Sequence, residues 1–167
     1  MSATDVAAAS KVGRQALAEA LRHVGVQESP PDSNRTMFGR WFGVNGVPWC
    51  AIFASYCFSV GAGVTLCRGW HGAGVNARGV AYVPTLEAWL RATGRRVPTG
   101  SPPLPGDLAV YDWDGGLSDH VGIVVAVRSG GALETVEGNT GIGNDTNGGE
   151  VMRRRRRVAQ VSTFGRL

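Results

Sequence analysis

The hydrophobic pattern divides the chain into a helical half and a strand-like half. In the first half, apolar residues recur every three or four positions, which predicts amphipathic helices over residues 10–24, around 37–42 and over 84–92. Beyond residue 106, β-branched and apolar residues alternate with glycine or asparagine turns. The strands expected there are residues 108–113, 121–127, 132–138 and 151–158. N-terminal helices followed by an antiparallel sheet predict an α+β fold in which the helices pack on the sheet.

Residues 51–60 are apolar on every face and predict a buried central helix. Pro48 lies just before its expected start, and Cys50 falls in its first turn. Backbone N–H groups in the first turn have no partner in the helix, and their partial positive charge favours a thiolate over a thiol. The position of Cys50 is therefore suited to a nucleophile.

His120 begins a predicted strand, and Glu137 and Asn139 share one face of the next strand. A turn centred between residues 129 and 130 would place Asn139 opposite His120 and Glu137 diagonal to it. A carboxylate in that place can hold the orientation and tautomer of an imidazole that serves as a base. Gly122 lies on the same face as His120, and we expect its missing side chain to admit the helix that bears the nucleophile.

Composition agrees with one folded domain over residues 1–167, because 43% of the residues are hydrophobic and 18% are charged. The chain has no apolar run of transmembrane length, and its start, MSATDVAAAS, lacks the pattern of a signal peptide. Three cysteines are too few for a disulfide framework in a chain this long, so we expect at least one free thiol.

The net charge of +4 and the run Arg153–Arg157 indicate attraction to polyanions. We interpret the run as a last strand whose side chains point alternately to solvent and along the sheet edge, with binding of anionic polymers as a secondary effect. The alternative hypothesis is a non-catalytic basic module that uses these arginines to bind nucleic acid or a virion partner.

Three aspartates, Asp112, Asp114 and Asp119, surround a Gly-Gly pair, and we interpret them as a polar turn rather than a cation loop, since further oxygen ligands are missing. We therefore expect no metal and no cofactor. Trp49 and Trp113 are candidate substrate-binding residues, because aromatic faces suit sugars and peptide stems.

Four segments together carry a family resemblance: GVPWCAIF at 46–53, LPGDLAVY at 104–111, DHVGIV at 119–124 and VEGN at 136–139. In order and spacing they resemble the CHAP family of cysteine, histidine-dependent amidohydrolases/peptidases, from about residue 16 to the C-terminus. The resemblance implies a papain-like α+β fold. It also implies Cys50 as the nucleophile, His120 as the base, Glu137 as the residue that orients the imidazole and Asn139 as an assisting residue.

The same resemblance implies cleavage of bacterial peptidoglycan, at the N-acetylmuramoyl–L-alanine amide or within the stem or cross-bridge peptide. Many relatives are phage endolysins, tail-associated lysins or bacterial wall hydrolases. Some relatives bind calcium ahead of the cysteine, but this chain offers only Asp32 there.

We expect a monomeric phage endolysin or virion-associated lysin without a separate wall-binding domain. It would be made in the cytoplasm and would reach the wall by lysis, by a secretion machine or within a virion. Peptidoglycan, anionic wall polymers and phage virion or tail proteins are the expected partners, and specific nucleic-acid binding is not expected. A bacterial NlpC-type stem-peptide endopeptidase is the alternative within the enzyme class.

Overall fold

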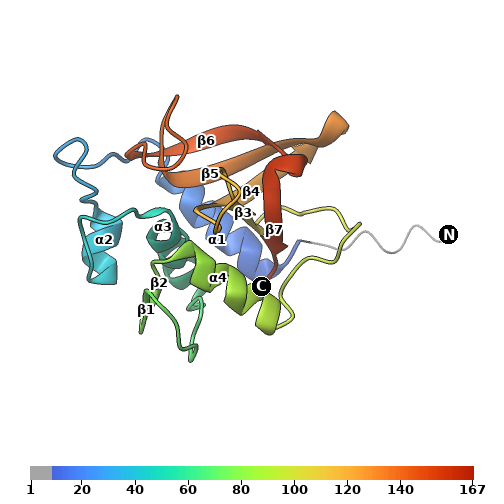
Figure 1. Ribbon diagram of the computed structural model, residues 1–167, viewed down its shortest axis with the longest axis horizontal. Helices are drawn as coiled ribbons and strands as arrows, with labels where there is room; N and C mark the ends of the chain where they lie inside the picture. The colour runs from blue at the N-terminus through green and yellow to red at the C-terminus, as the bar shows by residue number, and fades with distance from the viewer. Residues whose placement is uncertain (1–8) are drawn as a thin grey trace.

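The computed structural model describes residues 9–167, and its centre is a five-stranded antiparallel sheet with a layer of helices on one face (Figure 1). The helices are α1 (Lys11–Arg22), α2 (Met37–Phe42), α3 (Cys50–Tyr56) and α4 (Val83–Ala92), and α3 continues into a π-helical turn, Cys57–Gly61. The sheet strands are β3 (Leu108–Tyr111), β4 (His120–Arg128), β5 (Ala132–Thr140), β6 (Glu150–Arg157) and β7 (Val161–Gly165). A small hairpin, β1 (Val75–Asn76) and β2 (Gly79–Val80), precedes α4. The predicted α+β arrangement is confirmed.

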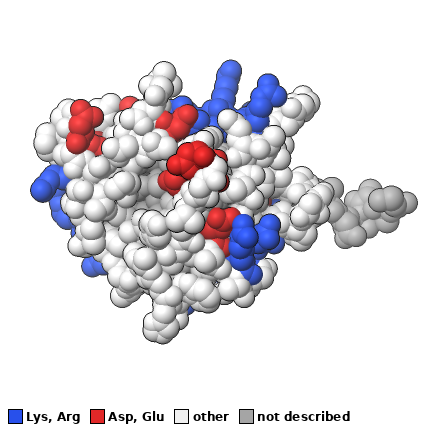
Figure 2. All heavy atoms as spheres, viewed as in Figure 1, with Lys and Arg blue, Asp and Glu red and all other residues white. Residues whose placement is uncertain are grey.

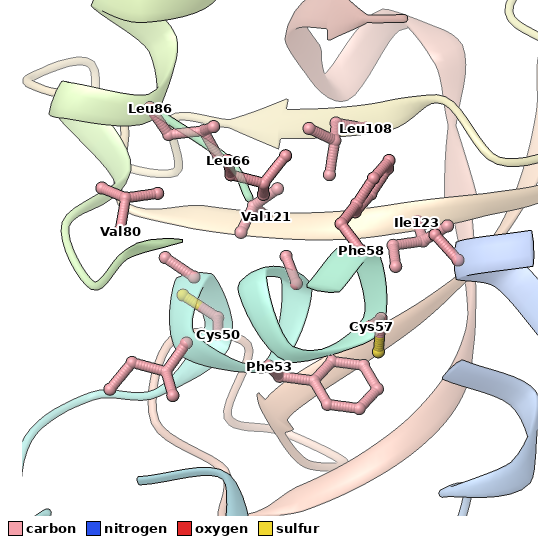
Figure 3. Close-up of a cluster of buried hydrophobic side chains, with 14 of the residues drawn as sticks. Cys50, Phe53, Cys57, Phe58, Leu66, Val80, Leu86, Leu108, Val121 and Ile123 are labelled. Atoms are coloured by element: carbon pink, nitrogen blue, oxygen red, sulfur yellow. The ribbon is translucent and has the colours of Figure 1, made fainter. Parts of the chain in front are cut away.

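The main core lies between α3 and the sheet. Figure 3 shows Phe53 and Phe58 of this helical segment in one buried cluster with Val121 and Ile123 of β4. Helix α3 is buried along almost its whole length, as its uniformly apolar sequence predicts, and it contacts both β4 and β5. This central position places Cys50, its first residue, directly beside the sheet.

The opposite face of the sheet carries a smaller cluster. Residues alternate between faces along a strand, so Leu108 and Val110 of β3 belong to the main core whereas Ala109 and Tyr111 point the other way. Ala109 and Tyr111 pack with Val124 and Leu133, and the partly buried residues packed against this cluster are Trp113, Val158, Val161 and Phe164.

The strand order, β6-β5-β4-β3-β7, includes one strand that the hydrophobic pattern did not predict. The arginine-rich strand β6 lies at one edge, as expected, but it is not the last strand. The chain turns through Val158–Gln160 and crosses the sheet, and β7 pairs with β3 at the far edge. Strand β7 is short, and its paired residues in β3 lie at least 50 positions earlier in the chain. The local hydrophobic pattern therefore gives little indication of this pairing.

Among the described residues, none of the helices has both the length and the apolar character needed to cross a bilayer. The prediction about a signal peptide falls mainly on residues 1–8, which lie outside the described residues.

Candidate active site

Cys50 is the first residue of α3, and its side chain is almost entirely enclosed, with 3% of its surface exposed. The helix starts there because Trp49, just before it, has left the helical conformation, while the carbonyl of Trp49 already accepts a bond from the amide of Phe53. The backbone N–H of Cys50 lies in the first turn, where amides have no intrahelical partner. The predicted placement of this thiol at a helix N-terminus is confirmed.

The other two thiols differ from Cys50 in position and environment. All three cysteines are free, and Cys57 and Cys67 are completely buried. Burial raises the pKa of Cys57 well above its ordinary value, and it raises the pKa of Cys67 to about 12. Both side chains are therefore neutral structural residues near neutral pH.

His120 and Glu137 form a buried pair on neighbouring strands. The Nε2 atom of His120 lies 2.9 Å from Oε2 of Glu137, and neither side chain is exposed to solvent. Gly122 is paired with Glu137 across the two strands, which places His120 diagonal to Glu137 as predicted. The pair is thus brought together by strand register.

The space at Gly122 is used differently from our expectation. A Cβ at this position would lie 2.7 Å from Cγ of Glu137, so the missing side chain makes room for the carboxylate and not for α3. The close approach of the helix occurs at Gly138 instead, where a Cβ would meet Phe53 at 2.7 Å and Trp49 at 2.9 Å. Gly122 therefore leaves space for the carboxylate of Glu137, and Gly138 allows the close approach of the helix that bears the thiol.

The turn of this hairpin also differs from the prediction. Arg128 is paired with Ala132, so the turn is centred on Gly130 rather than between residues 129 and 130. A register shift between Val124 and Ala126 compensates for this difference before the strands reach the site.

The site is charged although it is buried. Burial alone lowers the pKa of His120, but Cys50 and Glu137 outweigh it and hold the pKa well above its ordinary value of 6.5. Burial alone raises the pKa of Glu137, but Arg156 and His120 outweigh it and hold the pKa well below its ordinary value. Both shifts favour the charged forms of the pair, an imidazolium and a carboxylate.

The two nitrogens of His120 have separate surroundings. Nε2 is committed to Glu137, whereas Nδ1 is buried and has no hydrogen-bond partner within residues 9–167. Since Cys50 acts on the ring strongly enough to raise its pKa, Nδ1 is the nitrogen available to the thiol.

Asn139 lies next to this pair in sequence but contacts a loop. It lies near the end of β5 in a left-handed conformation, with φ 55°, and its Nδ2 donates to Oδ1 of Asn147 at 3.1 Å and to the carbonyl of Thr146 at 3.4 Å. No hydrogen bond joins it to His120 in the described structure, so its assisting role stays a prediction.

Trp49 does not present a binding surface, which corrects our expectation. Its ring is completely buried and stacked on Phe38, and its Nε1 donates to Oε1 of the buried Glu28 at 3.1 Å. Trp49 is a core residue that supports the loop before the thiol. Trp113 is half-buried, and its ring lies 6.3 Å from that of His120, so its proposed role in binding stays a prediction.

Sequence inspection missed the cationic partner of Glu137. Arg156, in the arginine run, donates from Nε to Oε1 of Glu137 at 2.9 Å and from a terminal nitrogen to Oε2 at 2.6 Å. Thr135 also donates to Oε1, at 2.7 Å. The sequence did contain a signal for this contact. Side chains alternate between the two faces of a strand, so every second arginine of the run was expected to point over the sheet.

A pocket of about 400 Å³ opens at the thiol, and its lining includes Pro48, Cys50, Tyr82, Asp114 and Asp119. A second, more apolar pocket of about 570 Å³ shares Pro48, Ala81 and Tyr82 with it. The two pockets adjoin at these three residues, and Cys50 lines only the first of them; we refer to the two adjoining pockets as the groove.

Asp112, Asp114 and Asp119 each offer an oxygen, and these atoms lie within 4.8 Å of one another. All three carboxylates accept hydrogen bonds from backbone amides of the turn, and Asp114 accepts one from Gly116. Asp112 accepts from the amides of Gly115 and Gly116, and Asp119 accepts from the amide of Trp113. The polar-turn interpretation accounts for these contacts.

A thiol at a helix N-terminus, beside a histidine and a carboxylate held by an antiparallel sheet, is the arrangement typical of papain-like cysteine hydrolases. The CHAP domain matches residues 42–139, which is more than half of the chain. The chain therefore belongs to the CHAP-domain family, whose members are peptidoglycan hydrolases.

Two similar solved structures are crystal structures of Ly7917, one of them with the hydrolyzing product of MDP. Each has 22% sequence identity and a TM-score of 0.51, and the alignment covers 93% of this chain and 62% of that one. This likeness supports the fold. No curated protein sequence matches the chain.

Proposed function

We propose that this chain cleaves an amide bond of bacterial peptidoglycan, with Cys50 as nucleophile and His120 as general base. The observation that carries the proposal is the 2.9 Å contact between Nε2 of His120 and Oε2 of Glu137, which leaves Nδ1 for the thiol. Family membership supports the substrate class, and the product bound in one Ly7917 structure agrees with it.

The proposed reaction is acyl transfer in two stages. His120 holds the thiol proton, the sulfur of Cys50 attacks the amide carbonyl, and backbone N–H groups at the start of α3 stabilise the oxyanion. The C–N bond then breaks, and His120 delivers the proton to the leaving amine. Water attacks the thioester while His120 accepts one of its protons, and the C–S bond breaks. The carboxylic acid product is released, and the Cys50 thiolate and protonated His120 are restored.

Two bonds fit this chemistry: the N-acetylmuramoyl–L-alanine amide and a peptide bond of the stem or cross-bridge. The second pocket, beside Pro48 and Tyr82, favours a substrate that extends beyond the cleaved bond. Our proposal includes a phage endolysin or virion-associated lysin that reaches the wall by lysis, secretion or within a particle. A bacterial stem-peptide endopeptidase is the alternative setting for the same chemistry.

The deciding experiment is digestion of purified peptidoglycan by wild type and Cys50→Ser, with products identified by mass spectrometry. Stem peptides with new L-alanine amino termini would identify an amidase, and cuts within the peptide would identify an endopeptidase. Cys57→Ala is the matched control, because it removes a buried thiol from the same helical segment and should leave product formation intact. Equal product from wild type and folded Cys50→Ser would contradict the proposal.

We also propose that anionic wall polymers bind the outer face of β6. Arg153, Arg155 and Arg157 are exposed there, whereas Arg154 and Arg156 are turned inward. Figure 2 shows basic side chains that project along the upper edge of the molecule, over β6, and acidic side chains nearer the centre of the same face. Binding at this edge would hold the enzyme at the wall without occupying the groove.

A further inference from the structure

The sheet face that holds His120 and Glu137 is closed by an arginine and two aromatic rings. Tyr111 and Trp113 stack with their ring centroids 4.7 Å apart, and the guanidinium carbon of Arg156 lies 4.9 Å from the ring centre of Trp113 and 5.7 Å from that of Tyr111. Only 8% of Arg156 is exposed. A cation thus lies between the two aromatic rings and the carboxylate that contacts His120.

The contacts of Arg156 fix both oxygens of Glu137. Its two hydrogen bonds, at 2.9 and 2.6 Å, form a fork that matches the carboxylate plane. Oε1 also accepts from Thr135, and Oε2 also contacts His120. A carboxylate held at four points cannot rotate without breaking several charge-assisted bonds, so the direction in which Oε2 faces the imidazole is set by Arg156 and Thr135.

Asp145 holds the far side of the same guanidinium. Its Oδ1 accepts from Arg156 at 2.8 Å and from Arg154 at 2.8 Å. Each of the two inward-facing arginines is therefore paired with a carboxylate. This arrangement separates them from Arg153, Arg155 and Arg157, which are exposed on the outer face of the strand.

We propose that Arg156 is a positioning residue of the hydrolytic site, which acts by holding Glu137 ionised and aimed at His120. The inference rests on the proposed function only in taking Cys50 and His120 as the reacting groups. In this proposal the inward-facing arginine Arg156 serves the active site, whereas Arg153, Arg155 and Arg157 face solvent.

Two substitutions separate the charge of Arg156 from its geometry. Arg156→Lys keeps the charge but cannot make the fork, whereas Arg156→Met removes both. Arg155→Met is the matched control, since it changes the adjacent, exposed arginine of the same strand. Circular dichroism and urea unfolding establish that each variant is folded.

The measurement is the rate of Cys50 alkylation by iodoacetamide as a function of pH, with the modified site located by mass spectrometry. We expect Arg156→Lys to react about tenfold more slowly with a nearly unchanged pH profile, as the loss of one charge-assisted hydrogen bond predicts. We expect Arg156→Met to react about a hundredfold more slowly, with its acidic limb moved to higher pH, because Glu137 loses the cation that lowers its pKa. Arg155→Met should match wild type.

A double-mutant comparison of Arg156 and Glu137 distinguishes a positioning role from a simple loss of packing. Because Arg156 acts through Glu137, the double variant Arg156→Lys/Glu137→Gln should react no more slowly than Glu137→Gln alone. Wild-type rates and pH profiles in Arg156→Lys and in folded Arg156→Met would overturn the proposal. If Arg156→Met does not fold, Arg156→Lys alone decides.

Alkylation requires no wall substrate, so this test is independent of the proposed substrate. A wild type that digests no peptidoglycan, but whose Cys50 alkylation depends on Arg156, would contradict the proposed function and support the positioning role.

Discussion

Gly138 of β5 lies so close to Phe53 of α3 that a Cβ at position 138 would be 2.7 Å from the Cβ of Phe53. The strand that carries Glu137 is thus in direct contact with the helix that begins at Cys50. This contact sets the distance between the nucleophile and the His120–Glu137 pair, because both the helix and the strand are buried and have little freedom to shift.

Gly138→Ala should therefore affect stability and activity together. The added methyl group overpacks the contact and should lower the free energy of unfolding by about 1–3 kcal/mol, and the displaced helix should slow Cys50 alkylation. Urea unfolding and alkylation rates measure the two effects. Gly116→Ala is the control for stability, since its nearest neighbour is the flexible carboxylate of Asp114 at 3.0 Å, and equal behaviour of the two variants would contradict the prediction.

The buried pair predicts how stability depends on pH. The pKa of Glu137 is lowered by folding, so its contribution to stability is present above its ordinary value of 4.5 and is lost as pH falls below it. The pKa of His120 is raised by folding, so its contribution is fully present below 6.5 and is lost as pH rises above that value. Both contributions are present together between pH 4.5 and 6.5.

Urea unfolding from pH 4 to pH 9 tests this dependence, with each proton contributing a slope of at most about 1.4 kcal/mol per pH unit. His120→Gln should flatten the decline above pH 6.5, and Glu137→Gln should flatten the decline below pH 4.5. Unchanged slopes in these variants would show that the pair does not produce the pH dependence.

Trp49→Phe should destabilise the protein without weakening substrate binding. The substitution keeps an aromatic ring but removes the donor to the buried Glu28, which should cost about 1–3 kcal/mol. We expect a lower urea midpoint and an unchanged KM on a soluble stem-peptide substrate. Trp113→Phe is the comparison, and we expect it to increase KM. An increased KM in Trp49→Phe with an unchanged KM in Trp113→Phe would instead identify Trp49 as a binding residue.

Replacement of Arg153, Arg155 and Arg157 by serine should weaken salt-sensitive binding to whole walls more than turnover of a soluble peptide. The reason is that these side chains face solvent on β6, away from the buried pair. Sedimentation with purified walls at increasing salt concentration measures the effect. Serine at Arg22, Arg40 and Arg68 changes net charge equally on other elements, so equal losses in both triple variants would argue for a general charge effect.

The β4–β5 hairpin has the predicted register at the active site, although its turn differs from the prediction. Spacing placed Glu137 diagonal to His120, and the structure agrees. The turn is nevertheless centred on Gly130, and the shift between Val124 and Ala126 restores the register at the site. Bulges depend on how a strand twists against its neighbours, so hydrophobic spacing alone does not locate them.

By itself, the sequence determined the helices and most of the strands, the start of the central helix at Cys50 and the closeness of His120 to Glu137. These features depend on periodicity, capping and the register of one hairpin, all of which are local. Tertiary structure alone decided the pairing of β7 with β3, the burial of Trp49 against Glu28 and the role of Arg156 over Glu137. Each of these joins residues distant in sequence, and such contacts are set by the packing of whole elements rather than by neighbouring residues.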